Sequence, residues 1–444
     1  MTTASENELL TRTGPGTPMG ELMREYWMPV ARSDEIAADG PPLRLMALGE
    51  KLVAFRDTAG RVGVMDHRCP HRCASLFFGR NEEGGIRCVY HGWKFDVAGN
   101  CLEMANVPPH QDFRHKVHAK VYPAQDRFGC VWIFMGAREL RPPFPEFEIA
   151  MLPPKSIGVR AIHHDCNWLQ AIENDLDTSH FGFLHFGATD PELLYDDDPS
   201  RWLAAQRQPE FHLEETPAGL MYASYRPAEP GHTYWRLGHY LVPFWVFPPA
   251  GPIQDLVIAK AYVPLDDENT MVIAMHSRKT PGTMPVMKNG EPIPGLGGVG
   301  PSRGADYLPN TTDWLGRWRL TKNGRNDWLI DRAAQRTGGV FSGIIGIQVQ
   351  DTAICESMGR ITDRTFEHLA SSDETIARTR RTLLRLVQAH QRDKSTPLPG
   401  VDDPGVYRGH RGGFFVAREG RPFREVYGEM LAQHAGAAPR WAAE

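Results

Sequence analysis

Four residues arranged in two short pairs have side chains that hold iron or zinc in proteins. The pairs are Cys69-Pro-His71 and Cys88-Val-Tyr-His91, separated by residues 72–87. Two thiolates and two imidazoles fit a structural zinc ion, which takes four such ligands as a tetrahedron. They also fit a Rieske [2Fe–2S] cluster, in which two Cys hold one iron and two His hold the other. Because each loop supplies one Cys and one His, two loop tips can clamp a flat two-iron cluster, so the pairing favours the cluster over zinc.

A second group of candidate ligands lies in the stretch from Asn167 to His185, where His180 and His185 stand five residues apart. On a helix with a kink or bulge, such a pair can face one point. Two imidazoles and one carboxylate on one face of an Fe(II) ion leave positions open for O₂ and substrate. The spacing alone is weak evidence, because it is more often that of core or solvent-facing histidines. The upstream pairs favour iron, because a one-electron donor implies an acceptor and iron with O₂ is the natural one.

The run CPHRCASLFFGRNEEGGIRCVYHGWKFD, residues 69–96, resembles the Rieske loop pair of the ring-hydroxylating oxygenases, in particular the phthalate 4,5-dioxygenase-like group. Asp177, His180 and His185 match that family's Asp-x-x-His-x-x-x-x-His motif. The resemblance implies that both histidines bind a mononuclear Fe(II), and that Asp177 bridges His91 to His180 across a subunit boundary. A head-to-tail homotrimer, or a stacked hexamer, would follow. Cys73 departs from the family, where a small residue or Arg is usual, and the fixed spacing of the other ligands makes it a bystander.

The third ligand of the mononuclear iron must be a carboxylate from elsewhere in the chain. Asp351 is the best candidate, because Gln350-Asp351 and the spacing to Glu356 match the family pattern. Glu356 itself and Asp363 are the rivals. Asn174 is expected to be a polar neighbour of the iron that does not bind it directly.

The resemblance implies an aromatic carboxylate as substrate, and Arg suits a carboxylate because its planar guanidinium offers paired donors. Arg207 and Ser179 are the predicted carboxylate contacts, with Arg236 as a second cation, although each also suits a structural role. The leading function is a terminal oxygenase that dihydroxylates a phthalate-type acid with O₂. The alternative is aryl-ether cleavage, by O-demethylation or by angular attack on phenoxybenzoate-type substrates. A Rieske protein that only transfers electrons is the third candidate.

No segment of the chain has the pattern of an NAD(P)H-oxidising domain. Gly295-Leu-Gly297-Gly-Val-Gly300 matches a dinucleotide fingerprint formally, but no strand precedes it and Pro301 prevents a following helix. A four-Cys ferredoxin spacing is also missing from the sequence. A separate flavin- or ferredoxin-type NAD(P)H reductase is therefore an expected partner.

The composition is that of a globular enzyme. The 444 residues are 41% hydrophobic and 23% charged, with a net charge of −5, and this length predicts two or three domains. The mild acidity argues against a nucleic-acid partner. No apolar run is long enough for a membrane span, and the first residues, MTTASENELL, lack the pattern of a signal peptide. A cytoplasmic location is the expectation.

The elements that must position the candidate ligands suggest an α+β protein in three parts. Residues 1–40 are predicted to be a helical segment that packs on the catalytic domain, with Thr17-Pro18 opening its helix. Residues 41–150 are predicted to form a small antiparallel β domain, the Rieske domain, whose loops carry metal ligands. Its strands are expected at 43–48, 51–56, 62–65, 94–97 and 131–134. A Pro-rich run, 141–147, ends it.

Residues 151–444 are predicted to form the catalytic domain, for which the resemblance implies a helix-grip fold, an antiparallel sheet with helices. A helical stretch at 166–185 precedes strands at 220–226, 234–242, 256–263 and 271–276. Helices are expected at 314–334 and from Ser371, which would form a capping box with Glu374. The Gly- and Pro-rich segment 281–304 is predicted to be a mobile surface loop or lid, and the chain beyond about 395 a peripheral tail.

Overall fold

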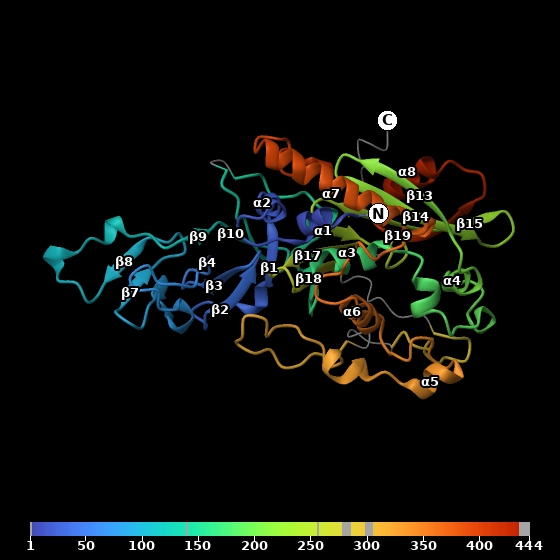
Figure 1. Cartoon of the computed structure of the whole chain (residues 1–444), viewed down its shortest axis with the longest axis horizontal. Helices are drawn as coiled ribbons and strands as arrows, with labels where there is room; N and C mark the ends of the chain where they lie inside the picture. Colours follow the sequence, from blue (N-terminus) through green and yellow to red (C-terminus); the bar gives the residue numbers. More distant parts are fainter. Residues whose placement is uncertain (1, 139–140, 255–256, 278–285, 298–304, 435–444) are drawn as a thin grey trace.

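The computed structural model describes residues 2–138, 141–254, 257–277, 286–297 and 305–434. Figure 1 shows an elongated molecule with a narrow lobe of short strands at one end and a broader body, in which helices surround a large sheet. The strands within each sheet pair antiparallel, and helices accompany them, so the α+β class predicted from the sequence is confirmed. Among the described residues, no helix combines the length and the apolar character needed to cross a bilayer.

The narrow lobe contains two four-stranded sheets, ordered β2-β3-β4-β9 and β5-β6-β7-β8. Buried side chains, among them Phe55 and Phe95, form one core that also contains Cys69 and Cys88. The loops that carry the candidate ligands therefore start from a packed base. The strands are β2 (Leu43–Ala47), β3 (Glu50–Arg56), β4 (Val62–Asp66), β5 (Arg80–Glu82), β6 (Gly85–Arg87), β7 (Trp93–Phe95), β8 (Cys101–Met104) and β9 (Val121–Tyr122).

The N-terminal residues join the narrow lobe to the body. Strand β1 (Met28–Arg32) pairs with β11 (Cys130–Ile133), which also pairs with β10 (Ala124–Arg127). Helices α1 (Ala4–Thr11) and α2 (Pro18–Arg24) pack against α7 (Glu374–Arg392) of the body. The hydroxyl of Thr17 accepts a hydrogen bond from the backbone N–H of Gly20 at 3.2 Å, so the predicted helix start is confirmed.

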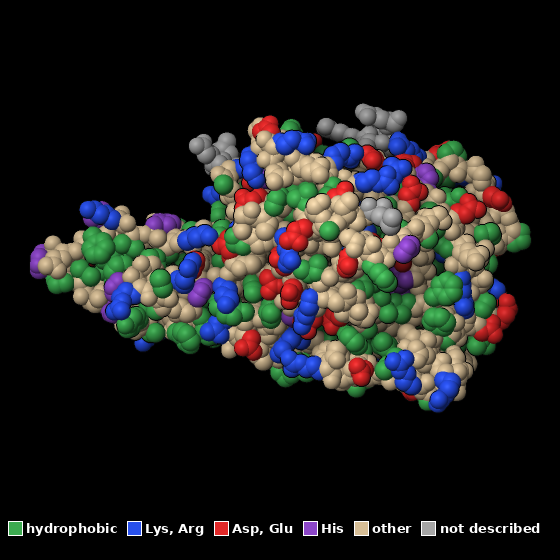
Figure 2. All heavy atoms as spheres, viewed as in Figure 1, with side chains coloured by type: hydrophobic (Ala, Val, Ile, Leu, Met, Phe, Trp, Pro, Cys, Tyr) green, Lys and Arg blue, Asp and Glu red, His purple; other side chains and the backbone are tan. Residues whose placement is uncertain are grey.

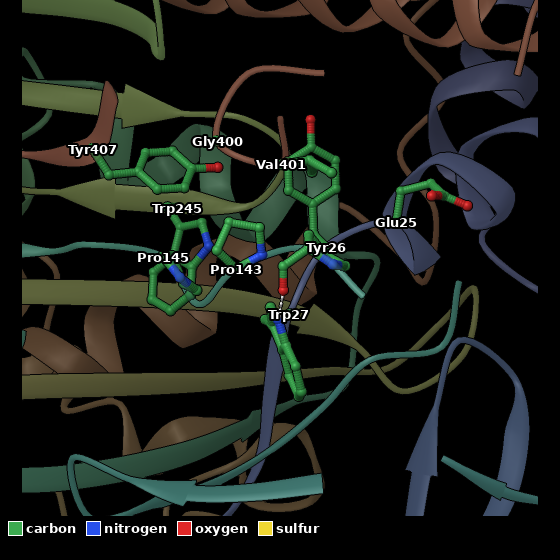
Figure 3. A pocket seen from close by; sticks show the side chains of 10 residues that line it. Glu25, Tyr26, Trp27, Pro143, Pro145, Trp245, Gly400, Val401 and Tyr407 are labelled. Atoms are coloured by element: carbon green, nitrogen blue, oxygen red, sulfur yellow. Dashed lines mark hydrogen bonds between the residues drawn. The ribbon is translucent and has the colours of Figure 1, made fainter. Parts of the chain in front are cut away.

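Tyr26 and Trp27 lie in the seam between these parts and are 3% and 4% exposed. The indole N–H of Trp27 donates to the carbonyl of Pro142 at 3.0 Å. Figure 3 shows both side chains beside a small cavity, together with residues of the Pro-rich run and of the segment around Tyr407. The cavity volume is about 10 Å³, which is room for about one water molecule. These aromatic residues are core, and the cavity is too small for an aromatic acid.

The body is built on an eight-stranded sheet ordered β12-β18-β17-β16-β15-β14-β13, with β19 paired to β15. Helices α3 (Trp168–Leu176) and α7 join a core on one face that includes Tyr222, while α8 (Phe423–His434) packs over Met221 on the other. The strands are β12 (Ile157–His164), β13 (Glu210–Thr216), β14 (Gly219–Pro227), β15 (His232–Leu241), β16 (Trp245–Phe247), β17 (Ile258–Pro264), β18 (Thr270–Ser277) and β19 (Gly413–Arg418). The remaining helices are α4 (Ser200–Ala205), α5 (Arg332–Thr337) and α6 (Ile347–Ser357).

The chain beyond residue 395 is part of the body, so the prediction of a peripheral tail is wrong. Strand β19 pairs with β15 from His232↔Arg418 to Leu237↔Gly413. Phe414 packs on one face of the sheet and Phe415 on the other. A strand that is apolar on both faces shows no alternation of polar and apolar residues along the sequence. For this reason the sequence pattern did not predict β19.

The helix predicted at 314–334 is also wrong. This segment is largely irregular and contains a short 3₁₀ helix, Gly324–Leu329, and the beginning of α5. The side chain of Asn323 donates to the carbonyls of Leu320 and Thr321 and accepts from the backbone N–H of Arg325. Asn side chains that bond to nearby backbone groups in this way compete with a helix.

The helix predicted from Ser371 is α7, but it begins at Glu374 and the predicted capping box does not form. The carboxylate of Asp373 accepts the backbone N–H of Ala370 at 2.7 Å instead. A carboxylate is a strong acceptor at a helix start, so Asp373 takes the role that the sequence pattern gave to Glu374.

Only residues 286–297 of the loop predicted at 281–304 are described, and Gly298 to Gly300 of the rejected fingerprint lie outside them. Residues 288–292 of the described part are exposed, as expected of a surface loop, whereas residues 293 and 295–297 are buried, contrary to that expectation, and form a wall of the body. Ile293 and Leu296 are 1% and 0% exposed, and they pack in one cluster with Phe186 and Tyr234. The wall is tied to the beginning of α6, where the backbone N–H of residue 346 donates to the carbonyl of Gly295 at 2.9 Å.

Candidate functional site

The two Cys-His loops share one backbone design. The backbone N–H of Cys73 donates to the carbonyl of Cys69, and that of Gly92 donates to the carbonyl of Cys88, each at 2.9 Å. Both closing residues have a positive φ, 60° at Cys73 and 77° at Gly92. Gly enters this region freely, whereas a residue with a side chain enters it at a cost. Cys73 therefore closes a turn, with an exposed thiol, and this supports its place outside the ligand set.

The loops place sulfur and nitrogen at opposite ends of one site. Cys69 and Cys88 are 1% and 3% exposed, and burial, with the adjacent Cys88 adding to it, raises the pKa of the Cys69 thiol to about 12. The rings of His71 and His91 lie nearer the surface with centroids 4.4 Å apart, and Trp93 stacks on His71. The buried Nδ1 of His91 has no hydrogen-bond partner among the described residues. Two thiols inside and two imidazoles outside fit a two-iron cluster.

A single zinc ion fits these four residues poorly. Zinc bonds of about 2.0–2.3 Å in a tetrahedron bring all ligand atoms within about 4 Å of one another. Among the described residues, His180, His185 and Asp351 form a group of three whose ligand atoms all lie within 4.8 Å of one another, and the Cys-His loops form no such group. The four ligands of the narrow lobe are more widely spread, as a two-iron cluster requires.

A π-helical turn, Phe181–His185, brings the two histidines of the body together. Helix α3 ends at Leu176, and after a short connection the backbone N–H of Phe186 donates to the carbonyl of Phe181 at 3.0 Å. Because a π turn joins residues five apart, His180 and His185 lie on the same side of it. Their Nε2 atoms are 3.1 Å apart. This turn is the bulge that the sequence spacing required.

Asp351 reaches the same point from α6. Its Oδ1 lies 3.2 Å from Nε2 of His185 and 3.7 Å from Nε2 of His180. Ligand atoms about 2.1 Å from a metal ion and at right angles to each other stand about 3 Å apart. This Oδ1 is buried and accepts no hydrogen bond within the described chain. Burial alone would raise the pKa of Asp351, but the two imidazoles outweigh it and hold that pKa below its usual value. The three side chains fit a divalent iron.

The two rival carboxylates face elsewhere. Glu356 accepts the backbone N–H of Asp165 at 2.9 Å, and Asp363 accepts the hydroxyl and N–H of Thr365. A helix turns 100° per residue, so Glu356, five residues after Asp351, points about 140° away from it. Neither rival joins the cluster of His180, His185 and Asp351.

Gln350 is a residue whose role sequence reasoning missed. It is fully buried, and its side-chain oxygen lies 2.6 Å from Nδ1 of His185. Its Nε2 donates to the carbonyls of Gly295 and Ile344 at 3.1 and 2.7 Å. Because the nitrogen faces carbonyls, the oxygen must face His185, and Nδ1 of His185 must carry the proton. The lone pair of His185 is therefore on Nε2, directed at the candidate metal position. In the sequence, the position of Gln350 directly before Asp351 was the only sign of this role.

Asp177 follows the last residue of α3 and lies beside His180. One carboxylate oxygen is 3.5 Å from Nδ1 of His180, and the other accepts the hydroxyl and the N–H of Ser179, both at 2.7 Å. Burial would raise the pKa of Asp177, but the nearby His180 imidazole and the bonds from Ser179 outweigh it and hold the pKa below its usual value. His91 precedes β7 in the narrow lobe, whereas Asp177 follows α3 in the body, and Figure 1 shows that these lie apart within one chain.

The predicted carboxylate contacts have different surroundings. Arg236, on β15, is 3% exposed and its guanidinium lies 4.0 Å from the centre of the Phe181 ring. Arg207 is half-buried and donates to the carbonyl of Gly187 at 3.1 Å. The hydroxyl of Ser179 is directed at Asp177. Of the two arginines, Arg236 is the more buried, and it lies beside the ring of the residue that follows His180.

Asn174 is half-buried near the end of α3. Its neighbour Glu173 is buried between Arg364 and Arg380, to which it is hydrogen-bonded, and Asp175 pairs with a lysine of β17. These ion pairs anchor the end of α3, and with it the approach to the histidines. Within the described chain, no hydrogen bond joins Asn174 to either histidine.

Comparisons with known proteins cover both sites. A family model described as Rieske [2Fe-2S] domain matches residues 26–123, and one described as LigXa C-terminal domain like matches 133–289 and 309–407. The chain is 44% identical over 433 residues to the 3-chlorobenzoate-3,4-dioxygenase oxygenase subunit of Comamonas testosteroni, covering 97% of this chain and 99% of that protein. It is 34% identical over 403 residues to the phthalate 4,5-dioxygenase oxygenase subunit of Pseudomonas putida, and the match covers 89% of this chain and 88% of that protein.

Among solved structures, dicamba monooxygenase bound to dicamba matches with a TM-score of 0.54 at 18% identity, over 83% of this chain and 98% of that one. This match shows a shared fold. The first family model spans the two Cys-His loops, which decides between cluster and zinc, and the second spans the cluster of His180, His185 and Asp351. The chain therefore belongs to the Rieske non-haem iron oxygenases and is an oxidoreductase that carries a Rieske [2Fe–2S] cluster and a mononuclear iron.

Proposed function

We propose that this chain is the terminal oxygenase of a system that dihydroxylates an aromatic carboxylate with O₂, using electrons from a separate flavin- or ferredoxin-type NAD(P)H reductase. The observation that carries the proposal is the buried guanidinium of Arg236, 4.0 Å from the ring centre of Phe181, the residue that follows His180. A cation beside an aromatic wall, next to an iron site, suits a benzoate-like molecule. The names of two relatives, on 3-chlorobenzoate and phthalate, point to the same class.

The residues of the two sites have separate proposed roles. The proposed cluster ligands are Cys69, His71, Cys88 and His91, and the proposed iron ligands are His180, His185 and Asp351. When bound, these groups supply one-electron transfer and O₂ activation, respectively. Gln350 holds the proton on Nδ1 of His185, and Asp177, 3.5 Å from Nδ1 of His180, would hold it there. Each imidazole would then have the lone pair of Nε2 available for a metal ion.

The substrate would lie between the histidines and the sheet. Arg236 holds the carboxylate through paired donors, while Phe181, Phe186 and Leu296 supply apolar walls that exclude water. Ser179 and Arg207 remain proposed contacts of the same carboxylate. Since the hydroxyl of Ser179 donates to Asp177, it would act on the substrate as an acceptor or through water.

We also propose a head-to-tail homotrimer, or a hexamer of two stacked trimers, in which Asp177 bridges His91 of one protomer to His180 of the next. Exposed apolar side chains support this arrangement. Val89 and Tyr90, beside His91, are 58% and 54% exposed, and Figure 2 shows hydrophobic side chains gathered on the narrow lobe around β7 and β8. Hydrophobic residues are exposed around the end of α6 as well, namely Phe183, Ile354, Met358 and Phe366. Two such patches are expected to cover each other.

Product analysis tests the proposed reaction. Benzoate, 3-chlorobenzoate, phthalate and a methoxybenzoate would be incubated with the oxygenase, a generic reductase, NADH and O₂. We expect a cis-diol of at least one acid. Formaldehyde and a phenol from the methoxybenzoate alone would favour ether cleavage, and oxidation of none of the acids would overturn the proposal. Asp351→Asn should abolish product, whereas Glu356→Gln, on the same helix, should retain it.

Replacement of Asp177 by Asn tests its proposed role as a bridge. The amide keeps the size of the carboxylate but loses its charge and one acceptor, so we expect both metals to be retained and turnover to fall by orders of magnitude. Metal content and the visible spectrum of the cluster are the controls. Turnover at the wild-type rate would rule out the bridging role.

A further inference from the structure

A second arginine lies beside Arg236 on the same face of the sheet. In the antiparallel register of β14 and β15, Ser224 is opposite Arg236 and Arg226 is opposite Tyr234. Residues directly opposite each other project to the same face, so all four point to one side. Tyr234 packs there with Phe186 and with Ile293 and Leu296 of the buried wall. Arg226 therefore lies on the same face of the sheet as Arg236, and these four side chains form the arginine floor of the candidate site.

The polar atoms of this floor have few partners in the chain. Arg226 and Arg236 are each 3% exposed and Ser224 is fully buried. Nε and Nη1 of Arg226, Nε of Arg236 and the hydroxyl of Ser224 are buried without a hydrogen-bond partner among the described residues. No described carboxylate lies within ion-pair distance of either arginine, although most other buried arginines of the chain, such as Arg364, Arg380 and Arg411, have one.

Two adjacent, buried and unpaired cations are unfavourable unless something supplies negative charge. Burial, with the like charge of Arg236 adding to it, lowers the pKa of Arg226 to about 10, so the guanidinium is still charged at neutral pH. The guanidinium of Arg226 lies 5.9 Å from the centre of the Tyr234 ring. A cation–π contact at this distance is too weak to replace an anion. The unpaired donors are arranged for a ligand that carries more than one anionic group.

We infer that Arg226 is a specificity-determining residue that binds a second carboxylate, so that the preferred substrates are aromatic dicarboxylates held by Arg236 at one carboxylate and by Arg226 at the other. The inference rests on the proposed function, because it assumes that an aromatic acid binds beside Arg236. It goes further in naming the residue that separates diacids from monoacids. The hydroxyl of Ser224, between the two arginines in the register, can donate to either carboxylate.

Equilibrium binding to the metal-loaded oxygenase, without reductase, tests this inference. Phthalate and benzoate would be titrated into wild type, Arg226→Met and Arg226→Lys. We expect wild type to bind phthalate at least 10-fold more tightly than benzoate. A lost charge-assisted hydrogen bond corresponds to about 10–100-fold in affinity, so Arg226→Met should bind phthalate 10–100-fold more weakly and benzoate unchanged. Arg226→Lys should recover part of the preference.

A structural role for Arg226 gives a different pattern. Removing an unpaired buried charge should leave the ligand-free protein as stable as wild type, whereas loss of a structural residue would lower the denaturation midpoint and weaken both acids together. Arg381→Met, on the exposed side of α7, is the control. If wild type binds both acids equally, or the variant weakens both alike, the inference is wrong while the proposed function stands. If neither acid binds or is oxidised, the proposed function itself fails.

Discussion

Replacing Gln350 by Leu should weaken metal binding by the body of the protein and destabilise the fold. Leu has a similar volume but neither accepts nor donates a hydrogen bond. The side-chain oxygen of Gln350 is the acceptor for Nδ1–H of His185 at 2.6 Å. Without it, the imidazole loses the bond that fixes its tautomer and its orientation toward Asp351.

The loss of stability in Gln350→Leu depends on which hydrogen-bonding groups are left without a partner. The carbonyls of Gly295 and Ile344, to which the amide of Gln350 donates, each keep another donor. The Nδ1–H of His185 keeps none within the described chain. One buried N–H without an acceptor costs about 1–3 kcal/mol, so we expect the free energy of unfolding to fall by about 2 kcal/mol. Loss of a hydrogen-bond partner behind a metal ligand weakens metal affinity by about 10–100-fold.

Two assays separate these effects. Iron affinity would be measured by competition with a chelator, and stability by urea denaturation of the iron-free protein. Gln350→Glu should restore iron affinity, because it again accepts from His185, but not stability, because its carboxylate faces two carbonyls. Gln348→Leu, two residues earlier on α6, is the matched control. Wild-type iron affinity and stability in Gln350→Leu would refute the role of Gln350 as the acceptor that orients His185.

Three further predictions concern single residues. Cys73→Gly should stabilise the protein by up to about 1 kcal/mol, because Gly adopts the φ of 60° without strain; a lower urea midpoint would contradict this. Burial raises the pKa of Glu356 from 4.5 to about 7, so its contribution to stability is fully present below pH 4.5 and is lost as the pH rises through 7. A unit of pKa is about 1.36 kcal/mol, and partial exposure reduces the effect. On going from pH 4.5 to pH 8, the free energy of unfolding of wild type should therefore fall by about 1–2 kcal/mol more than that of Glu356→Gln. An equal fall in both proteins would contradict this role of Glu356. Glu173→Ala should cost about 3–5 kcal/mol, because it leaves the buried Arg364 without a carboxylate partner among the described residues and leaves Arg380 with Glu367 alone; a loss under about 1 kcal/mol in denaturation would show that this ion cluster is not structural.

Local patterns predicted much of the narrow lobe. Loop ligands are close in the sequence, and the strands on either side of them form a core of neighbouring residues. Spacing alone therefore indicated two ligand pairs. The positive φ at Gly92 agreed with the tight turn that a glycine after His91 allows. The equal role of Cys73 in the other loop was not visible, because the sequence gives no sign that its turn has the same shape.

The body depended more on contacts between distant residues. The choice of Asp351 over Glu356 rests on which side of α6 faces the π turn, and this is set by packing. Similarly, Gln350 reaches His185 across 165 positions of the chain. Strand β19 was missed because it is apolar on both faces and because its partner, β15, lies about 180 residues earlier in the chain.

The sequence by itself determined the kinds of ligand, the two metal sites that they imply and the α+β class. These depend on residue type and short spacing, which local geometry converts directly into loops and turns. The tertiary structure alone decided how the ligands are oriented and which charges are left unpaired, as with Gln350 behind His185 and Arg226 beside Arg236. A hydrogen bond or a buried cation has meaning only once its neighbours are known, and those neighbours come from strands and helices far apart in the chain.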